Sequence, residues 1–292
     1  MKKCEAILKA LQNKGIKPTN KALIFASEGT RSFSNTLENY KFLVEDLKLN
    51  PKATGDNGEN VLHNLVKKKD QETIIAYFLD KGVDVNQATK EGNTVLMEVA
   101  KGSDVKLFET ILSKTKNINQ VNHKGLSALS FAVSNGSTDM ITALLANKAD
   151  AKIKDKEDKN LAYYLVQSYR ALRPNQKDEF SDKIQILKNA GLDFKSTQGS
   201  GSTLLHVAVL KNDVKLLSSL DEFNIDINAK DDEGMTVLHK AALLSKDDVV
   251  LKYLISKGAD KAIQTDFEET VYDLASENES LIDSKINIDF LK

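Results

Sequence analysis

The sequence predicts an all-α repeat solenoid built from stacked helix-turn-helix units. The first observation is a Gly-x-Thr-x-Leu pattern, in strong and degenerate copies, whose anchors fall at 58, 92, 125, 158, 201, 234 and 268. Their spacings are 34, 33, 33, 43, 33 and 34 residues, and a period of this length indicates a repeat array. The second observation is an apolar stripe at helical spacing late in the units, as in Ile74, Ile75, Phe78 and Leu79.

Within each unit the predicted elements follow in a fixed order. A first helix begins just after the anchor, and small residues such as Ala208 and Ala241 let successive first helices pack closely. A second helix carries the apolar stripe and ends near a glycine such as Gly258, because a helix C-terminus favours a residue that tolerates left-handed φ. In the first unit these helices are expected around 22–26 and 37–47. In the last unit the pattern is expected to break down at Asn278.

The unit that starts at Gly234 indicates the kind of repeat. It reads Gly-Met-Thr-Val-Leu-His-Lys-Ala-Ala, close to the Gly-x-Thr-Pro-Leu-His-x-Ala-Ala of the ankyrin repeat, which the chain resembles over nearly its whole length. The resemblance implies helix pairs joined by β-hairpin-like finger loops. One departure is the missing proline, whose place is taken by Val61, Val95, Ala128, Leu204, Val237 and Val271.

We predict one ankyrin-repeat domain over residues 1–292, because a solenoid grows by stacking and escapes the usual limit on domain size. Its repeats are expected at 19–57, 58–91, 92–124, 125–157, 158–200, 201–233 and 234–267. Residues 1–18 resemble the second half of a repeat, which suggests a fragment of a longer array or, alternatively, a natural half-repeat cap. Residues 268–292 are expected to form a C-terminal cap, where Leu291→Ala should cost much less stability than Leu238→Ala in a sandwiched repeat.

The charges of the chain balance. Lys and Arg number 41 against 42 Asp and Glu, a formal charge of −1, so nothing favours a nucleic acid or an anionic membrane as partner. The N-terminal residues do not form a signal peptide and no later stretch predicts membrane insertion. Two cellular compartments are compatible with the sequence. The chain is expected to be periplasmic or exported if a signal peptide was lost with missing repeats, as the resemblance to long exported bacterial ankyrin proteins suggests, and cytoplasmic otherwise.

No constellation of residues predicts catalysis. The ankyrin resemblance makes six polar residues structural, with the histidines bonded to loop backbone: His63, His206, His239, Thr94, Thr203 and Thr236. A zinc site would need clustered ligands, whereas the repeat holds these histidines about one layer or more apart. We therefore expect no metal, no cofactor and no enzyme activity.

What remains is surface for a partner. As the resemblance implies, ankyrin-type proteins bind other proteins with their finger tips and with the first helices of a concave face. The variable finger residues are the candidate contacts: Lys90, Glu91, Asn122, His123, Lys124, Lys156, Glu157, Asp232 and Glu233. Their mixed charges fit an unidentified protein, bound by a monomer, better than a nucleic acid. The alternative is a structural spacer in a longer array, with the binding sites in flanking repeats.

The repeat 158–200 offers a second candidate contact. Its spacing of 43 residues leaves about ten extra residues, which fall between its two helices over 168–183. Tyr169, Arg170 and Arg173 lie in this insertion, and Tyr and Arg are enriched in interface hot spots. The alternative is that the tyrosines prolong the helix and pack on neighbouring residues while the rest of the insertion is solvated.

Overall fold

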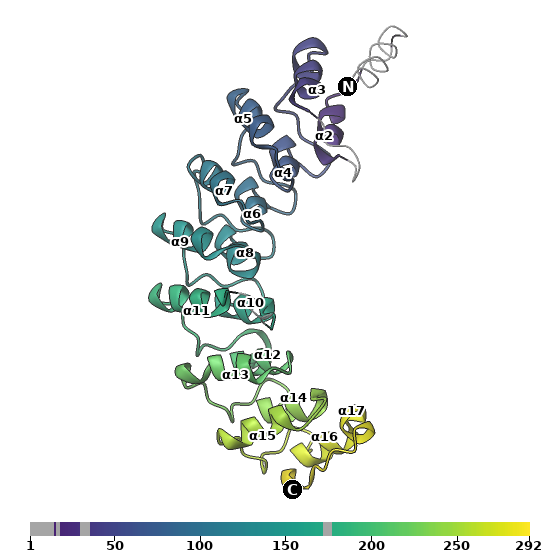
Figure 1. Cartoon of the computed structure of the whole chain (residues 1–292), viewed down its shortest axis with the longest axis vertical. Helices are drawn as coiled ribbons and strands as arrows, with labels where there is room; N and C mark the ends of the chain where they lie inside the picture. The colour runs from purple at the N-terminus through teal and green to yellow at the C-terminus, as the bar shows by residue number, and fades with distance from the viewer. Residues whose placement is uncertain (1–14, 16–17, 30–35, 172–176) are drawn as a thin grey trace. The chain divides into compact units, whose positions relative to one another are not determined.

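The structure is a computed structural model that describes residues 15, 18–29, 36–171 and 177–292. Most of the predicted half repeat 1–18, and Arg173 of the predicted insertion contact, lie outside the described residues. The regular elements within these ranges are helices (Figure 1), and their β structure consists of isolated bridges that pair Ala88 with Thr94 and Lys154 with Asn160 at two fingers. The predicted all-α repeat solenoid with hairpin-like fingers is confirmed.

The chain divides into two compact units, residues 1–150 and 151–292. In the first unit, α2 packs on α4, α4 on α6 and α6 on α8, while α4, α6 and α8 also pack on their own second helices (Figure 1). A π-helical turn, Phe42–Asp46, continues the second helix of the first repeat. The helices of this unit are α2 (Lys21–Glu28), α3 (Leu37–Lys41), α4 (Val61–Leu65), α5 (Glu72–Asp80), α6 (Val95–Val99), α7 (Val105–Leu112), α8 (Ala128–Asn135) and α9 (Thr138–Ala146).

The second unit has the same arrangement. The first helices α10, α12, α14 and α16 pack in succession, and each also packs on its own second helix (Figure 1). The helices of this unit are α10 (Leu161–Ser168), α11 (Glu179–Asn189), α12 (Leu204–Val209), α13 (Val214–Ser219), α14 (Val237–Leu244), α15 (Val249–Ser256), α16 (Val271–Glu277) and α17 (Glu279–Asp283). Two 3₁₀ turns, η2 (Gly199–Gly201) and η3 (Asp221–Phe223), lie between these helices, and a third, η4 (Asp289–Leu291), follows α17.

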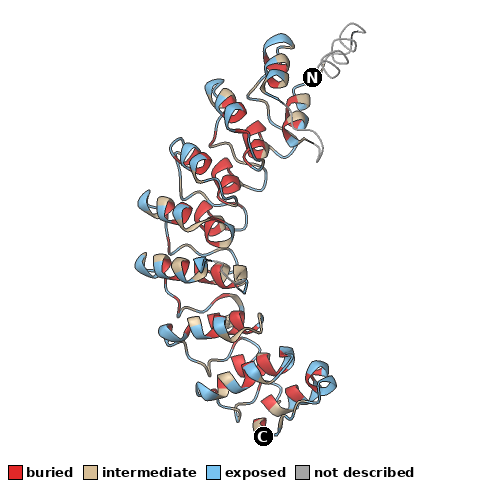
Figure 2. Ribbon diagram, viewed as in Figure 1, coloured by how far each residue is buried: buried red, intermediate tan, exposed pale blue. Residues whose placement is uncertain are grey.

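Side-chain caps start the first helices in the absence of the repeat's usual proline. Asn60 Oδ1 accepts a hydrogen bond from the N–H of Leu62 at 3.0 Å, and Asn160 Oδ1 accepts one from Ala162 at 2.9 Å. These bonds satisfy N–H groups that have no partner within the helix. The core lies between the helices, where buried positions face one another (Figure 2). It includes four alanines that are 0% exposed and allow the first helices to approach closely: Ala100, Ala132, Ala208 and Ala241.

The insertion is shorter than predicted. Helix α10 ends at Ser168 and α11 begins at Glu179, so the linker is residues 169–178 rather than 168–183. Asp178 caps α11, because its Oδ1 accepts a hydrogen bond from the N–H of Ser181 at 3.1 Å. This cap lets the second helix of the repeat begin earlier than its apolar stripe alone indicates.

The prediction that the last unit breaks down at Asn278 is wrong. Asn278 is buried, and its Oδ1 caps α17 by accepting a hydrogen bond from the N–H of Ser280 at 2.9 Å. Its amide donates to the carbonyls of Ala242 at 2.8 Å and Ser245 at 2.9 Å, at the end of α14. Asn278 therefore starts a short second helix and attaches the last helix pair to the preceding repeat.

The end of the chain is also more buried than expected. Leu291 is 1% exposed and lies in η4, which packs on α16. The burial of Leu291 removes the reason for expecting a mild effect of its replacement, because a large-to-small change costs free energy wherever the side chain is fully enclosed.

We now expect Leu291→Ala and Leu238→Ala each to lower the free energy of unfolding by about 2–5 kcal/mol, the usual cost of truncating an enclosed leucine. Leu238 is 0% exposed. Urea unfolding measures both effects. The control is Ile282→Ala at a position that is 55% exposed, where a change within about 0.5 kcal/mol is expected. A loss at Leu291 as small as that at Ile282 would contradict this expectation.

The fold requires glycine at the sixth anchor, Gly234, for two reasons. Its φ is +71°, and a Cβ built on it would lie 2.6 Å from the backbone nitrogen of Asp266 in the next finger. Gly258 shares only the first reason, since its φ is +93° but a Cβ there would meet nothing within 4 Å.

We therefore expect Gly258→Ala to cost about 1–2 kcal/mol of stability, the price of a left-handed backbone at alanine. Gly234→Ala should cost more, because the backbone of the next finger must also shift. Urea unfolding of the two variants compares them directly. Equal losses of unfolding free energy in the two variants would show that the contact with the Asp266 backbone does not constrain residue 234.

Candidate protein-binding surface

Several fingers are shaped in the same way by one polar side chain three residues before the anchor. Asp231 Oδ1 accepts hydrogen bonds from the N–H groups of Glu233 and Met235, both at 3.0 Å. Asp155 Oδ1 does the same for Glu157 at 2.8 Å and Lys159 at 2.9 Å. These side chains fold the backbone of the finger into a tight turn and direct the tip residues outward.

Asn122 occupies this same position in its own finger. Its Oδ1 accepts hydrogen bonds from the N–H groups of Lys124 and Leu126 at 3.0 Å, and its amide donates to Asn93 Oδ1 at 2.8 Å. Asn122 is only 7% exposed. The side chain thus shapes the loop and leaves little surface for a partner, so we remove it from the proposed contacts.

Backbone hydrogen bonds connect successive fingers within each unit. In the first unit the N–H of Lys90 donates to Asn57 O at 2.7 Å, and the N–H of His123 donates to Glu91 O at 2.8 Å. In the second unit the N–H of Asp232 donates to Ser200 O at 3.2 Å. The finger tips therefore form a connected surface in which one finger supports the next.

The other finger residues of the predicted contact set are exposed. Asp232 and Glu233 lie at the tip that Asp231 shapes, next to a buried ion pair in which Lys240 Nζ lies 2.5 Å from Asp231 Oδ2. Burial alone would raise the pKa of the Asp231 carboxyl, but the Lys240 ammonium and the N–H groups of the turn outweigh it and lower the pKa. The exposed members in both units are Lys90, Glu91, His123, Lys124, Lys156, Glu157, Asp232 and Glu233.

The repeat histidines link a first helix to the next finger. His206 Nδ1 accepts from the N–H of Thr203 at 3.1 Å, and its Nε2 lies 3.0 Å from Met235 O in the following finger. Since Nδ1 accepts, the proton must lie on Nε2, which donates to the carbonyl. His63 repeats this geometry with Asn60 and with Asn93 O.

His239 keeps only half of this arrangement. Its Nδ1 lies 3.1 Å from the N–H of Thr236, but its Nε2 faces the backbone of Ile263 and Glu269 without a hydrogen bond of good geometry. In all three histidines, burial lowers the pKa of the imidazole and favours the neutral ring. His63 and His206 thus link their first helices to the next finger.

The described part of the insertion packs against the protein. The ring of Tyr169 meets Phe180 edge-on at 5.0 Å between centroids, and its hydroxyl donates to Asp213 Oδ2 at 3.1 Å. Burial and then this carboxylate raise the pKa of Tyr169 to about 12. Arg170 is exposed. Tyr169 therefore secures the insertion and leaves Arg170 as its described candidate contact.

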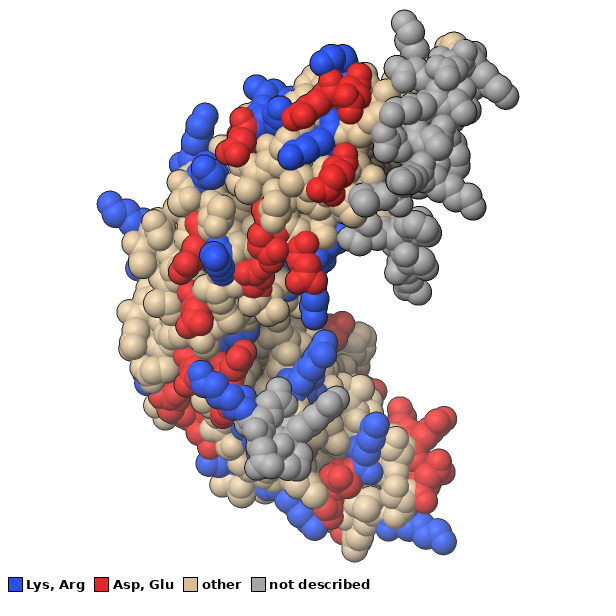
Figure 3. Space-filling view, turned by 45° about the horizontal axis from the view of Figure 1, so that its top comes forward, with Lys and Arg blue, Asp and Glu red and all other residues tan. Residues whose placement is uncertain are grey.

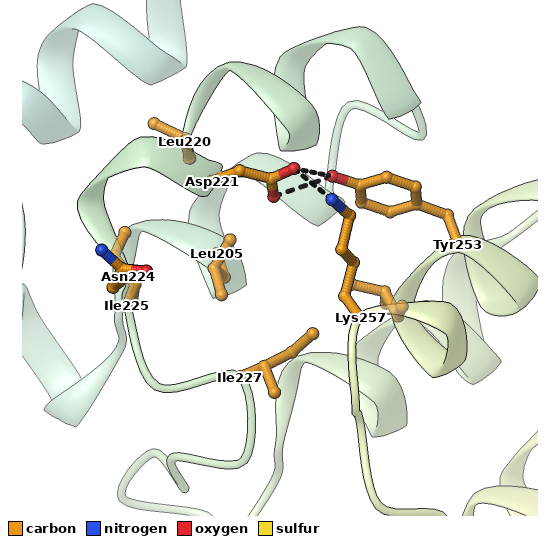
Figure 4. Close-up of a pocket in the computed structure, with 9 residues that line it drawn as sticks. Leu205, Leu220, Asp221, Asn224, Ile225, Ile227, Tyr253 and Lys257 are labelled. Atoms are coloured by element: carbon orange, nitrogen blue, oxygen red, sulfur yellow. Dashed lines mark hydrogen bonds and ion pairs between the residues drawn. The ribbon is translucent and has the colours of Figure 1, made fainter.

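A cavity of about 280 Å³ opens between η3, the loop that follows it and the end of α15 (Figure 4). It exists because α13 is short and gives way to η3, after which Asn224 turns the chain with φ of 46°. Ile225 and Ile227 are only half-buried here. Their counterparts after α5, Val83 and Val85, are 5% and 4% exposed. The shortened helix thus leaves apolar side chains incompletely covered.

The polar groups of this cavity satisfy one another. Asp221 accepts from the Tyr253 hydroxyl at 2.8 Å and from Lys257 Nζ at 2.6 Å (Figure 4). Burial and then the Asp221 carboxylate raise the pKa of Tyr253. Two donors, the Tyr253 hydroxyl and the Lys257 ammonium, thus bind the Asp221 carboxylate.

Among the residues that the structure describes, no three or more His, Cys, Asp or Glu side chains are grouped so as to hold a metal ion. No helix formed by residues 18–29, 36–171 and 177–292 is both long and apolar enough to cross a membrane.

Sequence reasoning missed a set of exposed apolar side chains in the second unit. Leu210 is 50% exposed, Leu243 37%, Leu244 49% and Phe267 76%. Leu210 and Leu243 each lie seven residues after the threonine that starts their helix, Thr203 and Thr236. Gln167 and Glu277 fill this place in α10 and α16. An alignment of the repeats on the residue that starts each first helix would have shown that the two leucines stand where other repeats have polar residues.

A family model described as ankyrin repeats in three copies matches residues 23–122, 62–155 and 169–265. These matches cover well over half of the sequence. The chain belongs to the ankyrin repeat family.

The curated relatives are much longer proteins. The chain is 25% identical over 251 residues to the E3 ubiquitin-protein ligase KEG of Arabidopsis thaliana, a match that covers 83% of this chain and 14% of that protein. It is 30% identical over 158 residues to human neurogenic locus notch homolog protein 1, covering 54% of this chain and 6% of that protein. The chain therefore spans a small part of the curated relatives it matches.

Solved structures share the fold. The human ASB11 ankyrin repeat domain matches with a TM-score of 0.63 and 20% identity, over 77% of this chain and 97% of that chain. A chain from the complex of the Bdellovibrio bacteriovorus predatory endopeptidase Bd0816 with the immunity protein Bd3460 matches with a TM-score of 0.53 and 23% identity, over 66% and 93%. At these identities the likeness concerns the fold alone.

The buried histidines make stability depend on pH. Because their pKa values in the folded state lie below the unfolded value of about 6.5, protons bind preferentially to the unfolded chain. The stabilisation that the neutral histidines give to the folded state is fully present above about pH 6.5 and is lost as the pH falls below this value. The free energy of unfolding then decreases by up to about 1.4 kcal/mol per pH unit for each histidine.

Urea unfolding between pH 7.5 and 5.5 measures this loss. His206→Gln should give a smaller decrease in the free energy of unfolding over this range than the parent chain. The exposed His123 provides the control, since His123→Gln should leave the decrease unchanged. The same pH dependence in the parent and in His206→Gln would contradict the assignment.

Proposed function

We propose that this chain is a non-catalytic scaffold that binds a partner protein through its finger tips and first helices. Ankyrin repeats generally mediate protein–protein interaction. The observation that carries the proposal is the exposure of variable, charged tip residues on fingers that are hydrogen-bonded to one another, as at His123 and Asp232. A surface ordered before binding loses less conformational entropy when a partner arrives.

The polar groups best suited to chemistry are occupied by structural bonds. The Nδ1 atoms of His63 and His206 already accept backbone hydrogen bonds. In the cavity between η3 and α15, Asp221 is bonded to Tyr253 and Lys257. These arrangements support a binding module over an enzyme, since a general base needs a free acceptor within reach of the substrate.

A second contact is proposed at the insertion. Arg170 is exposed beside Tyr169, whose bonds to Asp213 and Phe180 hold the start of the linker. An anchored aromatic side chain that positions an exposed guanidinium suits recognition of a carboxylate on a partner. Arg173 belongs to this proposal from the sequence and lies outside the described residues.

Charge reversal at the finger tips tests the proposal. Lys90→Glu with Lys124→Glu should weaken binding of a partner identified by cross-linking from the finger tips at least tenfold, as reversed charges repel what they attracted. Calorimetric titration gives the affinity. The melting temperature should stay unchanged, because both side chains are exposed.

Lys106→Glu is the matched control, since Lys106 is an exposed lysine of the same unit on the second helix α7. Binding by this variant should equal that of the parent chain. If the finger and control variants bind equally well, the finger surface is not the contact. If the chain alone captures nothing while a longer form with flanking repeats does, the alternative of a structural spacer is correct.

A further inference from the structure

The cavity beside η3 has an apolar lining that its own chain leaves partly uncovered. Ile225 and Ile227 are half-buried there. Leu192 and Phe194 occupy the equivalent places after α11 and are 7% and 3% exposed. Apolar surface left open in a concave site points to an apolar group from outside the chain. The apolar residues that surround this one space are Leu205, Leu220, Ile225, Ile227 and Leu254 (Figure 4).

The volume of the cavity sets the size of the group that it can hold. The cavity measures about 280 Å³. An apolar cavity of about 150 Å³ in a protein is enough to enclose benzene. Drug-sized ligands occupy sites of about 300–1,000 Å³. The cavity therefore has room for one aromatic side chain and its methylene stem.

The charges around the cavity favour an uncharged occupant. Figure 3 shows basic and acidic side chains interspersed along much of the face in view, so the wider surface has no field of one sign that selects a charged partner. At the mouth itself, Lys257 Nζ lies 2.6 Å from Asp221 Oδ2. A charged group in the cavity would compete with this ion pair and lose its own water. The neighbouring charges outside the lining are Glu222, paired with Lys188, and Asp226.

The mouth also offers hydrogen-bonding groups that suit a peptide backbone. An ammonium has three N–H groups, and the side chain of Lys257 is 43% exposed, so it can donate to an acceptor besides Asp221. The exposed Asn224 lies across the cavity from Lys257 (Figure 4), and its amide contains both a donor and an acceptor. A peptide backbone presents the complementary C=O and N–H groups.

We infer that this cavity binds the side chain of a phenylalanine in an exposed segment of a partner protein, whose backbone is held by Lys257 and Asn224. A phenyl ring is uncharged, fits the volume and buries a large apolar area. Its face also suits the Lys257 ammonium, which lies 5.4 Å from the centroid of the Tyr253 ring. The inference rests on the proposed function for its choice of a protein partner, and it adds a site that includes none of the finger residues.

The probe is N-acetyl-phenylalanine methylamide, which carries the ring and both flanking peptide groups. In NMR spectra of the full chain with ¹³C-labelled isoleucine methyl groups, it should cause saturable shifts at Ile225 and Ile227. Ile111 and Ile141, both 0% exposed in the first unit, should not shift.

Analogues of the probe test the choice of side chain. The alanine analogue should cause no shifts, and the leucine analogue should bind at least threefold more weakly than the phenylalanine probe. An analogue with a carboxylate at the tip of the ring should bind at least tenfold more weakly, because its charge would enter the apolar lining.

Substitutions locate the site. Ile225→Phe should fill the cavity and abolish the shift at Ile227, whereas Ile282→Phe, at an isoleucine of the same unit that is 55% exposed, should bind within twofold of the parent chain. Lys257→Met should weaken the probe at least fivefold but toluene less than twofold, because toluene has no backbone to bind. Lys215→Met, at an exposed lysine of α13, is the matched control. Circular dichroism melting checks that each variant is folded.

The same variant tests the partner. Ile225→Phe should lower the affinity of the partner that is cross-linked from the finger tips at least tenfold, and Ile282→Phe should leave that affinity unchanged. Equal binding of the partner by folded Ile225→Phe would overturn the inference.

Other results would overturn it as well. These are equal binding of the probe by folded Ile225→Phe, equal binding of the carboxylate or leucine analogue, or shifts at Ile111 and Ile141 as large as those at Ile225. Toluene that binds as tightly as the probe would assign the cavity to a small apolar molecule instead. If the probe does not bind while Lys90→Glu/Lys124→Glu still weakens the partner, the proposed function stands and this inference fails.

Discussion

Each repeat of this protein depends on its neighbour to cover its apolar face. The first helices are five to eight residues long, too short to be stable alone in water, and their buried side chains meet those of the adjacent first helix. The alanines at Ala208 and Ala241, both 0% exposed, permit this close approach. Stability therefore comes from the interfaces between repeats, as expected of a fold whose units contact only their neighbours in sequence.

That dependence explains the structure of the C-terminal end. The last described helix pair, α16 and α17, is followed by η4, which packs on α16. Asn278 connects α17 to the end of α14 through two hydrogen bonds. Leu291, near the end of the described chain, is 1% exposed. The Asn278 amide thus attaches this helix pair to the preceding repeat, the Leu291 side chain packs against it, and both residues are buried.

The positions that stacking leaves free are the ones that distinguish this protein. The polar residue three positions before the anchor, the repeat histidine and the anchor itself hold the fingers, as seen for Asp231, His206 and Gly234. Between these fixed points the tips and the place occupied by Leu210 and Leu243 can vary without cost to the fold. Charged tips in both units and exposed apolar side chains in the second unit occupy these positions.

The sequence by itself determined the repeat, its family and the order of helices, because these depend on periodic patterns that recur within about 33 residues. It also identified the exposed finger residues such as Lys90 and Asp232, since their position in the period places them at a tip. Only the tertiary structure decided that Asn122 shapes its loop, that Asn278 and Leu291 are buried, and that the shortened α13 leaves a cavity beside Ile225. The burial of Asn278 and the cavity depend on contacts with a neighbouring repeat, and the burial of Leu291 depends on the packing of η4 on α16. A pattern read along one repeat carries no information about how much of a side chain the next repeat covers.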